Sequence, residues 1–160
     1  MKPAVIAAIF VAGFISGQIV QAERQDPPRL PAERVTGIGG IFIKAKDPKV
    51  LTAWYNDHLG VPRANGPVPP LFQWRDHEDP KVVGNTVWAL FNANTKYFAP
   101  STAPFMINYR VNHLDGLLAR LRAAGVTVEG KVVEDFNGKF GWVMDPEGNK
   151  IELWEPKPGF

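Results

Sequence analysis

Residues 35–61, VTGIGGIFIKAKDPKVLTAWYNDHLGV, contain the pattern that decides the fold of this 160-residue chain. The stretch opens with a β-rich run, TGIGGIFIKA, whose glycines allow close backbone approach or a cavity on one side. Asp47 and Pro48 then supply a helix N-cap and a proline at the first helical position. Apolar residues at helical spacing follow: Val50, Leu51, Trp54, Tyr55 and Leu59. We therefore predict a strand followed by an amphipathic helix that ends at Gly60.

The second half of the chain repeats this order. The strand-like run FMINYRV (105–111) precedes Asn112, a predicted N-cap, and Asp115 completes an approximate capping box. The buried stripe of this second helix consists of Leu114, Leu117, Leu118 and Leu121. Gly125 is expected to end the helix.

Two apolar strands follow each predicted helix. In the first half they are 71–76 and 85–91, which read as antiparallel neighbours. In the second half they are 139–144 and 150–154, joined by the turn sequence DPEGN.

The two halves can be overlaid. Segments 47–61 and 112–126 have the same length, which aligns cap, helix and glycine stop at a constant offset of 65 residues. Two successive strand-helix-strands units predict an α+β fold in which helix covers one face of each sheet.

The N-terminus predicts export. Lys2 precedes an apolar run from 4 to 15, and Ala22 is a small residue at a cleavage position, so residues 1–22 read as a signal peptide. An uncleaved anchor is the alternative, but the run is shorter than the roughly 20 residues that a spanning helix needs. Residues 23–34 form a proline-rich, charged leader that is expected to be flexible. The predicted location is periplasmic or secreted, with no stable membrane anchor after cleavage.

Composition excludes several functions. The net charge of +2 is spread along the chain, so we expect no nucleic-acid partner. The absence of cysteine removes disulfides, thiolate ligands, a cysteine nucleophile and lipid attachment to a processed N-terminal cysteine. The glycines at 37, 39 and 40 lie within a strand, so they lack the strand-turn-helix setting of a dinucleotide site.

Three segments resemble the vicinal oxygen chelate superfamily, which includes glyoxalase I, extradiol dioxygenases and bleomycin-resistance proteins. They are GIGGIFIKAKDPKVLTAWYNDHLGV (37–61), FMINYRVNHLDGLLARLRAAGV (105–126) and FGWVMDPEGNKIELWEP (140–156). The resemblance implies one domain over 35–156, built of two βαβββ modules (35–100 and 105–156). Their mixed sheet would be cupped around a small-molecule pocket, commonly in a homodimer.

Metal-dependent members of this superfamily bind a divalent ion through four side chains. The resemblance places these positions at Gly40, at Ala89 or Trp88, at Met106 and at Glu152. Only Glu152 can bind a hard cation, and one carboxylate does not make a tight site for zinc, nickel, manganese or iron. We therefore predict no metal and no other cofactor, with a divalent metal as the alternative.

A metal site elsewhere has little support in the sequence. His58, His77 and His113 all fall outside the strand interiors and read as solvated surface residues. The run Asp76-His77-Glu78-Asp79 is the best remaining cation candidate, although consecutive loop carboxylates are usually solvated.

Strand alternation and the family pattern together assign the residues that face the cup. The predicted ligand-binding set is Phe42, Lys44, Trp74, Met106, Asn108, Arg110, Glu152 and Trp154. These residues would give apolar and aromatic walls with a few polar groups that orient a guest. Lys44 and Arg110 could hold an anionic group, or be solvated cations at strand ends.

Glu152 is the one catalytic candidate. It could act as a general base or hydrogen-bond partner for a guest, or pair with Lys44 or Arg110 across the cup. The tryptophans raise a similar choice between an aromatic box and ordinary core; they are Trp74, Trp88, Trp142 and Trp154. For Trp88 and Trp142 the core is favoured.

Three functions remain open at this point. The first is an exported protein that binds a small, aromatic or amphipathic molecule without the family metal. The second is a superfamily enzyme, a lyase, isomerase or dioxygenase, with a degenerate or rearranged metal site. The third is a structural domain whose cup is filled by Phe42, Met106 and tryptophan side chains.

Overall fold

The computed structural model describes residues 32–65, 69–77 and 79–160. The predicted signal peptide, and the predicted leader up to residue 31, lie outside the described residues. The helices and strands follow the chain in this order: β1 (Val35–Ala45), α1 (Pro48–Leu59), β2 (Leu71–Arg75), β3 (Val83–Asn92), β4 (Phe105–Val111), α2 (Leu114–Ala123), β5 (Val128–Asp135), β6 (Gly138–Met144) and β7 (Lys150–Pro156). Neither of these two helices is long and apolar enough to cross a membrane.

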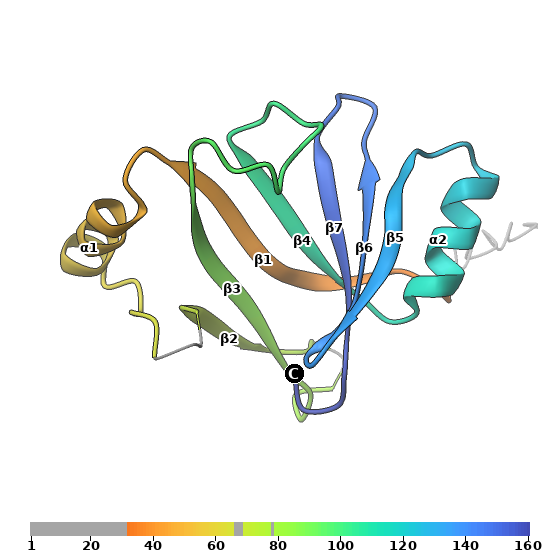
Figure 1. Cartoon of the computed structure of the whole chain (residues 1–160). Helices are drawn as coiled ribbons and strands as arrows, with labels where there is room; N and C mark the ends of the chain where they lie inside the picture. Colours follow the sequence, from red (N-terminus) through yellow and green to blue (C-terminus); the bar gives the residue numbers. More distant parts are fainter. Residues whose placement is uncertain (1–31, 66–68, 78) are drawn as a thin grey trace, which may run out of the picture.

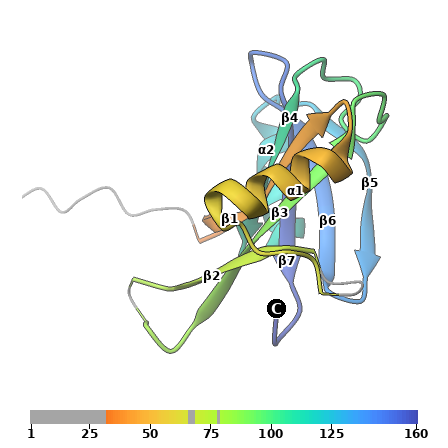
Figure 2. The ribbon, with the colours of Figure 1, turned by 90° about the vertical axis from the view of Figure 1, so that its left-hand side faces the viewer.

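All seven strands form one curved mixed sheet in the order β2-β3-β1-β4-β7-β6-β5 (Figure 1). Each unit closes by pairing its first strand in parallel with its last, β1 with β3 and β4 with β7. The units then join edge to edge, because β1 pairs antiparallel with β4. The helices flank the sheet at opposite ends, and α1 lies across β1 and β3 (Figures 1 and 2). The predicted α+β fold with a cupped mixed sheet is confirmed.

The ends of α1 are those expected from the sequence. The Asp47 carboxylate accepts hydrogen bonds from the backbone N–H groups of Lys49 at 3.0 Å and Val50 at 3.1 Å. Gly60 adopts the left-handed conformation (φ 67°), which favours glycine because it has no Cβ. Both signals therefore act locally, as N-cap and C-cap.

The start of α2 differs from the prediction. His113 is the N-cap residue and makes no side-chain capping bond, so the expected role of Asn112 is wrong. The Asn112 side chain instead accepts from the Arg34 N–H and donates to the Ala32 carbonyl. The first N–H of α2, on Leu114, donates to a carboxylate oxygen of Glu155 at 2.6 Å. A partner from β7 thus replaces the local cap.

This change also corrects the alignment of the two units. Their N-caps, Asp47 and His113, are 66 residues apart rather than 65. The new offset aligns Phe42 with Asn108 and Lys44 with Arg110.

In both units the observed strands differ from the predicted ones. The sequence reading after the second helix missed β5, because six of its eight residues are exposed and charges interrupt its apolar pattern. Among the described residues, the first unit has two strands after its helix and not the three of a βαβββ module. Residues 60–65 and 69–70 contain no strand beyond an isolated bridge at Asn65. Prolines at 62, 69 and 70 lack the N–H that pairing requires.

The core has two parts, one on each face of the sheet. Beneath α2 the buried residues are Val111, Leu114, Leu117, Leu118, Val143 and Leu153. On the concave face they are Phe42, Phe98 and Met106. The expected stripe of α2 is therefore confirmed, although Leu121 is only half-buried. In α1 no residue is buried, and Val50, Trp54 and Leu59 are exposed by 66, 47 and 62%.

Candidate functional site

The four positions that the family uses for metal binding converge on the concave face. Ala89 and Met106 are both cross-strand partners of Phe42, and Glu152 is the partner of Asn108. Of the two candidates on β3, Ala89 faces this side. Trp88 faces α1 instead, where its ring lies 5.0 Å from that of Tyr55.

Glu152 is held by three neutral donors. It is 2% exposed, and its carboxylate accepts from the Asn108 side-chain amide at 2.6 Å and the Trp142 indole at 2.8 Å. The Tyr97 hydroxyl supplies a third hydrogen bond. The alternative in which Glu152 pairs with Lys44 or Arg110 is wrong, since no salt bridge among the described residues involves any of the three. Hydrogen-bond donors replace a counter-charge because they can also satisfy a buried carboxylate.

Tyr97 is the residue at this site that the sequence reading missed. Burial of its hydroxyl raises the pKa of Tyr97, and the negative charge of Glu152 and the hydrogen bond to it raise the pKa further. Tyr97 therefore stays protonated and acts as a donor. Its ring stacks on Phe91 at 5.5 Å, and the Lys150 ammonium group donates to its carbonyl at 2.9 Å. An aromatic pair, Tyr97-Phe98, inside an otherwise polar connection was the signal available.

Phe98 closes the centre of the cup. Its side chain is fully buried, packs with Phe42 and Met106, and lies 5.2 Å from the Phe91 ring. The Lys44 ammonium group lies 5.2 Å from the centre of the Phe98 ring. The connection between β3 and β4 thus places an aromatic side chain over the positions where the family binds its metal.

The residues at these positions do not fit a metal ion. Glycine, alanine and methionine side chains offer no hard ligand, and the carboxylate of Glu152 already accepts three hydrogen bonds. No group of three or more histidine or acidic side chains that could hold a metal occurs in the described parts of the chain.

The alternative metal ligands lie apart from one another. His58 packs on Trp54 at 5.2 Å, and His113 lies 3.9 Å from Glu33. In the 76–79 run, Asp76 accepts from the Asp79 N–H, and Glu78 lies outside the described residues. These interactions make a turn rather than a cluster of inward-pointing ligands.

The four tryptophans do not form an aromatic box, which was the alternative to an ordinary core. Trp142 and Trp154 both lie on the concave face, where Trp154 stacks on Phe140 at 6.2 Å. Trp88 lies on the opposite face, and Trp74 is paired with Gly84 and donates to the Thr86 hydroxyl at 3.0 Å. Because cross-strand partners share a face, Trp74 lies on the side of β3 opposite Ala89. The Trp74 ring nevertheless reaches the Arg110 end of β1, because a Cβ atom on Gly37, the partner of Arg110, would lie 2.7 Å from it.

The glycines of β1 admit neighbouring side chains rather than a ligand. A Cβ atom on Gly39 would overlap the side chain of Asn108 and lie 2.8 Å from the Trp154 ring. A Cβ on Gly40 would lie 2.6 Å from Phe42. Of the two expectations for these glycines, close approach applies here.

Arg110 lies at one end of the concave face. Its guanidinium carbon is 5.5 Å from the centre of the Trp154 ring. Burial lowers the pKa of Arg110, and its Nη1 atom is buried without a hydrogen-bond partner among the described residues. Arg110 therefore carries one buried donor that the described residues leave unsatisfied.

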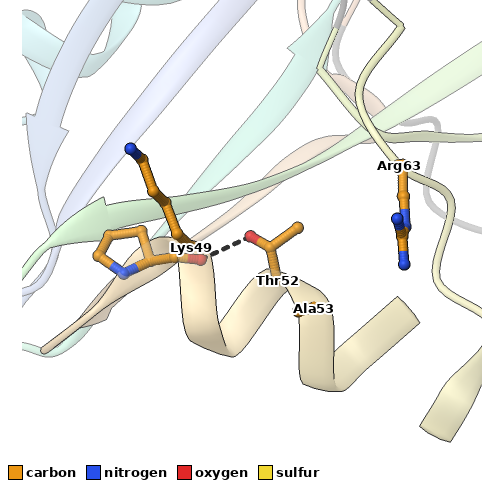
Figure 3. A pocket seen from close by; sticks show the side chains of 5 residues that line it. Lys49, Thr52, Ala53 and Arg63 are labelled. Carbon is orange, nitrogen blue, oxygen red and sulfur yellow. Dashed lines mark hydrogen bonds between the residues drawn. The ribbon is translucent and has the colours of Figure 1, made fainter. Parts of the chain in front are cut away.

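A separate hollow lies beside α1, away from the cup (Figure 3). Its polar groups bind one another: the Thr52 hydroxyl donates to the Pro48 carbonyl at 2.7 Å, and Arg63 pairs with Asp57 at 2.9 Å. Among the described residues no buried, unpartnered group lines this hollow, so it adds nothing to the site.

A cupped sheet of two related units, with its site positions on four inner strands, defines a vicinal oxygen chelate protein. The chain belongs to the glyoxalase-like domain family, whose sequence model matches residues 40–154. No curated protein matches the sequence.

Solved structures share this fold. One is methylmalonyl-CoA epimerase from Mycobacterium tuberculosis, with 23% identity, a TM-score of 0.50 and coverage of 82% of this chain and 95% of that chain. Another is a variant of the Streptomyces coelicolor methylmalonyl-CoA epimerase in complex with 2-nitronate-propionyl-CoA. It has 17% identity, a TM-score of 0.57 and coverage of 78% and 97%. At these identities the likeness concerns the fold alone.

Proposed function

We propose that this protein is an exported, metal-independent member of its family that binds a small aromatic or amphipathic molecule on the concave face. The observation that carries the proposal is the environment of Glu152. Its carboxylate is occupied by three neutral donors, while the other family positions hold Gly40, Ala89 and Met106. A metal-dependent relative would instead need three or four oxygen or nitrogen ligands at these positions.

Next to the buried Phe98, the concave face has side chains that are suited to binding a small molecule. Phe140 and Trp142 present half-buried aromatic surface beside the buried Trp154, and Arg110 adds a cationic group. Aromatic walls with a few fixed polar groups are typical of small-molecule sites. Phe42, Met106 and Phe98 fill only the centre of the cup, so they support the purely structural function for that part alone.

Metal content and ligand-induced stabilisation together test the proposal. Protein purified without chelators should carry substoichiometric metal by elemental analysis, and added zinc, nickel, manganese or iron should leave its melting temperature unchanged. Aromatic molecules should raise that temperature, because a ligand that binds only the folded state stabilises it. Stoichiometric metal whose removal abolishes a measurable turnover would refute the proposal. No shift with any aromatic compound would favour the structural function.

Export has its own measurement. The periplasmic or secreted fraction of the native host should contain a chain that begins at Glu23, as found by intact-mass analysis. A chain retained in the membrane with residue 1 intact would contradict cleavage and support the anchor.

An enzyme of the superfamily is the second candidate, favoured by one observation. Glu152 and Tyr97 place a carboxylate and a phenol in direct hydrogen bond inside the cup, and such groups can transfer protons when a substrate displaces one of them. Glu152→Gln would then abolish turnover of a substrate while leaving its binding intact.

A further inference from the structure

We propose that the hollow at the Arg110 end of the sheet binds a small organic carboxylate with a planar apolar body, held by the Arg110 guanidinium. The inference rests on the proposed small-molecule binding and names the class of ligand. In this proposal the residue that holds the ligand is Arg110 and not Glu152. Arg110 lies at the end of the sheet where β1 begins and where β2, β4 and β7 end.

Arg110 is the first observation. Its cross-strand partner on β7 is Trp154. The Arg110 guanidinium lies over the Trp154 ring rather than against a carboxylate. One buried donor, Nη1, has no partner among the described residues. A buried donor left unpaired costs stability, so a residue kept in this state is expected where a ligand completes it.

The hollow itself is the second observation. It has a volume of about 280 Å³, a size suited to a small molecule. Its walls include Thr36, Trp74, Val82, Arg110, Asn112 and Pro156. The indole of Trp74 thus lies in the same hollow as the guanidinium, and it packs against Gly37, the cross-strand partner of Arg110. A planar apolar body can pack on the indole while a carboxylate meets Arg110.

The hollow has mixed charge, with one guanidinium and two carboxylates in its own lining. Asp76 and Glu155 also line it, but each carboxylate already accepts a backbone N–H, from Asp79 at 3.0 Å and from Leu114 at 2.6 Å. A neighbouring hollow shares Thr36, Trp74 and Asp76 with this one, and adds Arg34, Arg75 and His77. Taken together, the two adjoining hollows are lined by three arginines and by two carboxylates whose charge is partly satisfied by backbone donors.

A carboxylate fits this arrangement better than a neutral ligand. The guanidinium fork donates two parallel hydrogen bonds to a carboxylate, and these bonds are about twice as strong as neutral ones. An amide of the same shape accepts only one such bond and carries no charge. The structure thus predicts discrimination between each aryl carboxylate and its own amide.

The test compares benzoate, cinnamate and indole-3-acetate with their amides, using thermal shift and titration by NMR of the tryptophan indole signals. The carboxylates should raise the melting temperature more than the amides and should shift the Trp74 indole signal. Arg110→Met should weaken carboxylate binding about tenfold or more, the loss expected for a paired guanidinium. Arg110→Lys, which keeps the charge without the fork, should bind with intermediate affinity.

Arg122→Met is the matched control, because it removes the same charge from an exposed position on α2. It should leave carboxylate affinity unchanged. Without ligand, Arg110→Met should melt at or above the wild-type temperature, since it removes a buried unpaired donor.

The outcomes separate the two proposals. If neutral aromatic compounds bind and carboxylates gain nothing over amides, or if Arg110→Met binds carboxylates as the wild type does, the carboxylate site is refuted and small-molecule binding stands. If Arg110→Met and Arg110→Lys both melt well below the wild type without ligand, Arg110 is structural and this inference fails. If no compound binds, both proposals fail.

Discussion

The two units of the sheet share one order of elements but bury their helices to different extents. In α2, Leu114, Leu117 and Leu118 are buried against the sheet, whereas no residue of α1 is buried. The two units also differ in residue type at the site, where Ala89 in the first unit corresponds to Glu152 in the second. Equal local patterns therefore do not predict equal packing, because burial depends on what the sheet presents to each helix.

The core beneath α2 gives the largest expected effect. Leu118→Ala should lower the free energy of unfolding by about 2–5 kcal/mol, because Leu118 is 1% exposed and its loss leaves a cavity. Leu59→Ala in α1 is the matched control, since Leu59 is 62% exposed, and should change stability by about 0.5 kcal/mol or less. Urea denaturation measures both. Equal losses would show that α1 is buried in solution, by a partner or a second copy.

The buried carboxylate gives the next effect. Glu152→Ala places in the second unit the residue that the first unit has at this position. It leaves the Asn108, Trp142 and Tyr97 donors without an acceptor, and should cost about 3 kcal/mol by denaturation. Glu152→Gln keeps an acceptor and should cost less. A stability gain in the alanine variant would instead indicate a functional, strained carboxylate.

The connection between the units gives a smaller effect. Tyr97→Phe removes only the hydroxyl that donates to Glu152 and keeps the ring on Phe91. The loss of one hydrogen bond to a charged group should cost about 2 kcal/mol, again by urea denaturation. Tyr55→Phe is the control in the first unit. No difference between these variants would mean that the Tyr97 bond does not form in solution.

The pH dependence gives the smallest expected effect. The folded pKa of Tyr97 lies above its unfolded value of 10.0, so its contribution is fully present below pH 10 and is lost as the pH rises further. The wild type should lose stability more steeply than Tyr97→Phe between about pH 10 and 11, above the ordinary tyrosine pKa. Ultraviolet titration should show one tyrosine ionising after the others. Parallel stability curves would contradict the raised pKa.

Much of the fold could be predicted from local signals. These signals depend on residues that are close together in the sequence, so the local sequence is enough to predict them. They are the cap Asp47, the C-terminal Gly60 of α1 and the leucines of α2. The N-cap of α2 could not be found in this way, because the carboxylate beside its first N–H belongs to Glu155 on β7, 41 residues away. The strand β5 was missed because an edge strand with mostly exposed residues has no apolar alternation to detect.

The site was predictable in its positions but not in its contacts. Strand alternation and the family pattern together placed Met106, Asn108 and Glu152 on one face, as the structure has them. The partners of Glu152 depend on Tyr97, which lies in an irregular connection where no periodicity applies. The surroundings of Trp74 could not be predicted from its own strand, because its pairing with Gly84 decides which side of β3 it joins.

The position of β5 at the rim of the sheet bears on the solubility of the protein. As an outermost strand it presents unpaired backbone groups, a template on which another chain could add a strand and aggregate. Its sequence, VEGKVVED, carries four charged side chains and a glycine in eight residues. Adding a strand there would bring charges close together and desolvate them. The residues that hid β5 from sequence analysis thus also protect this edge against aggregation.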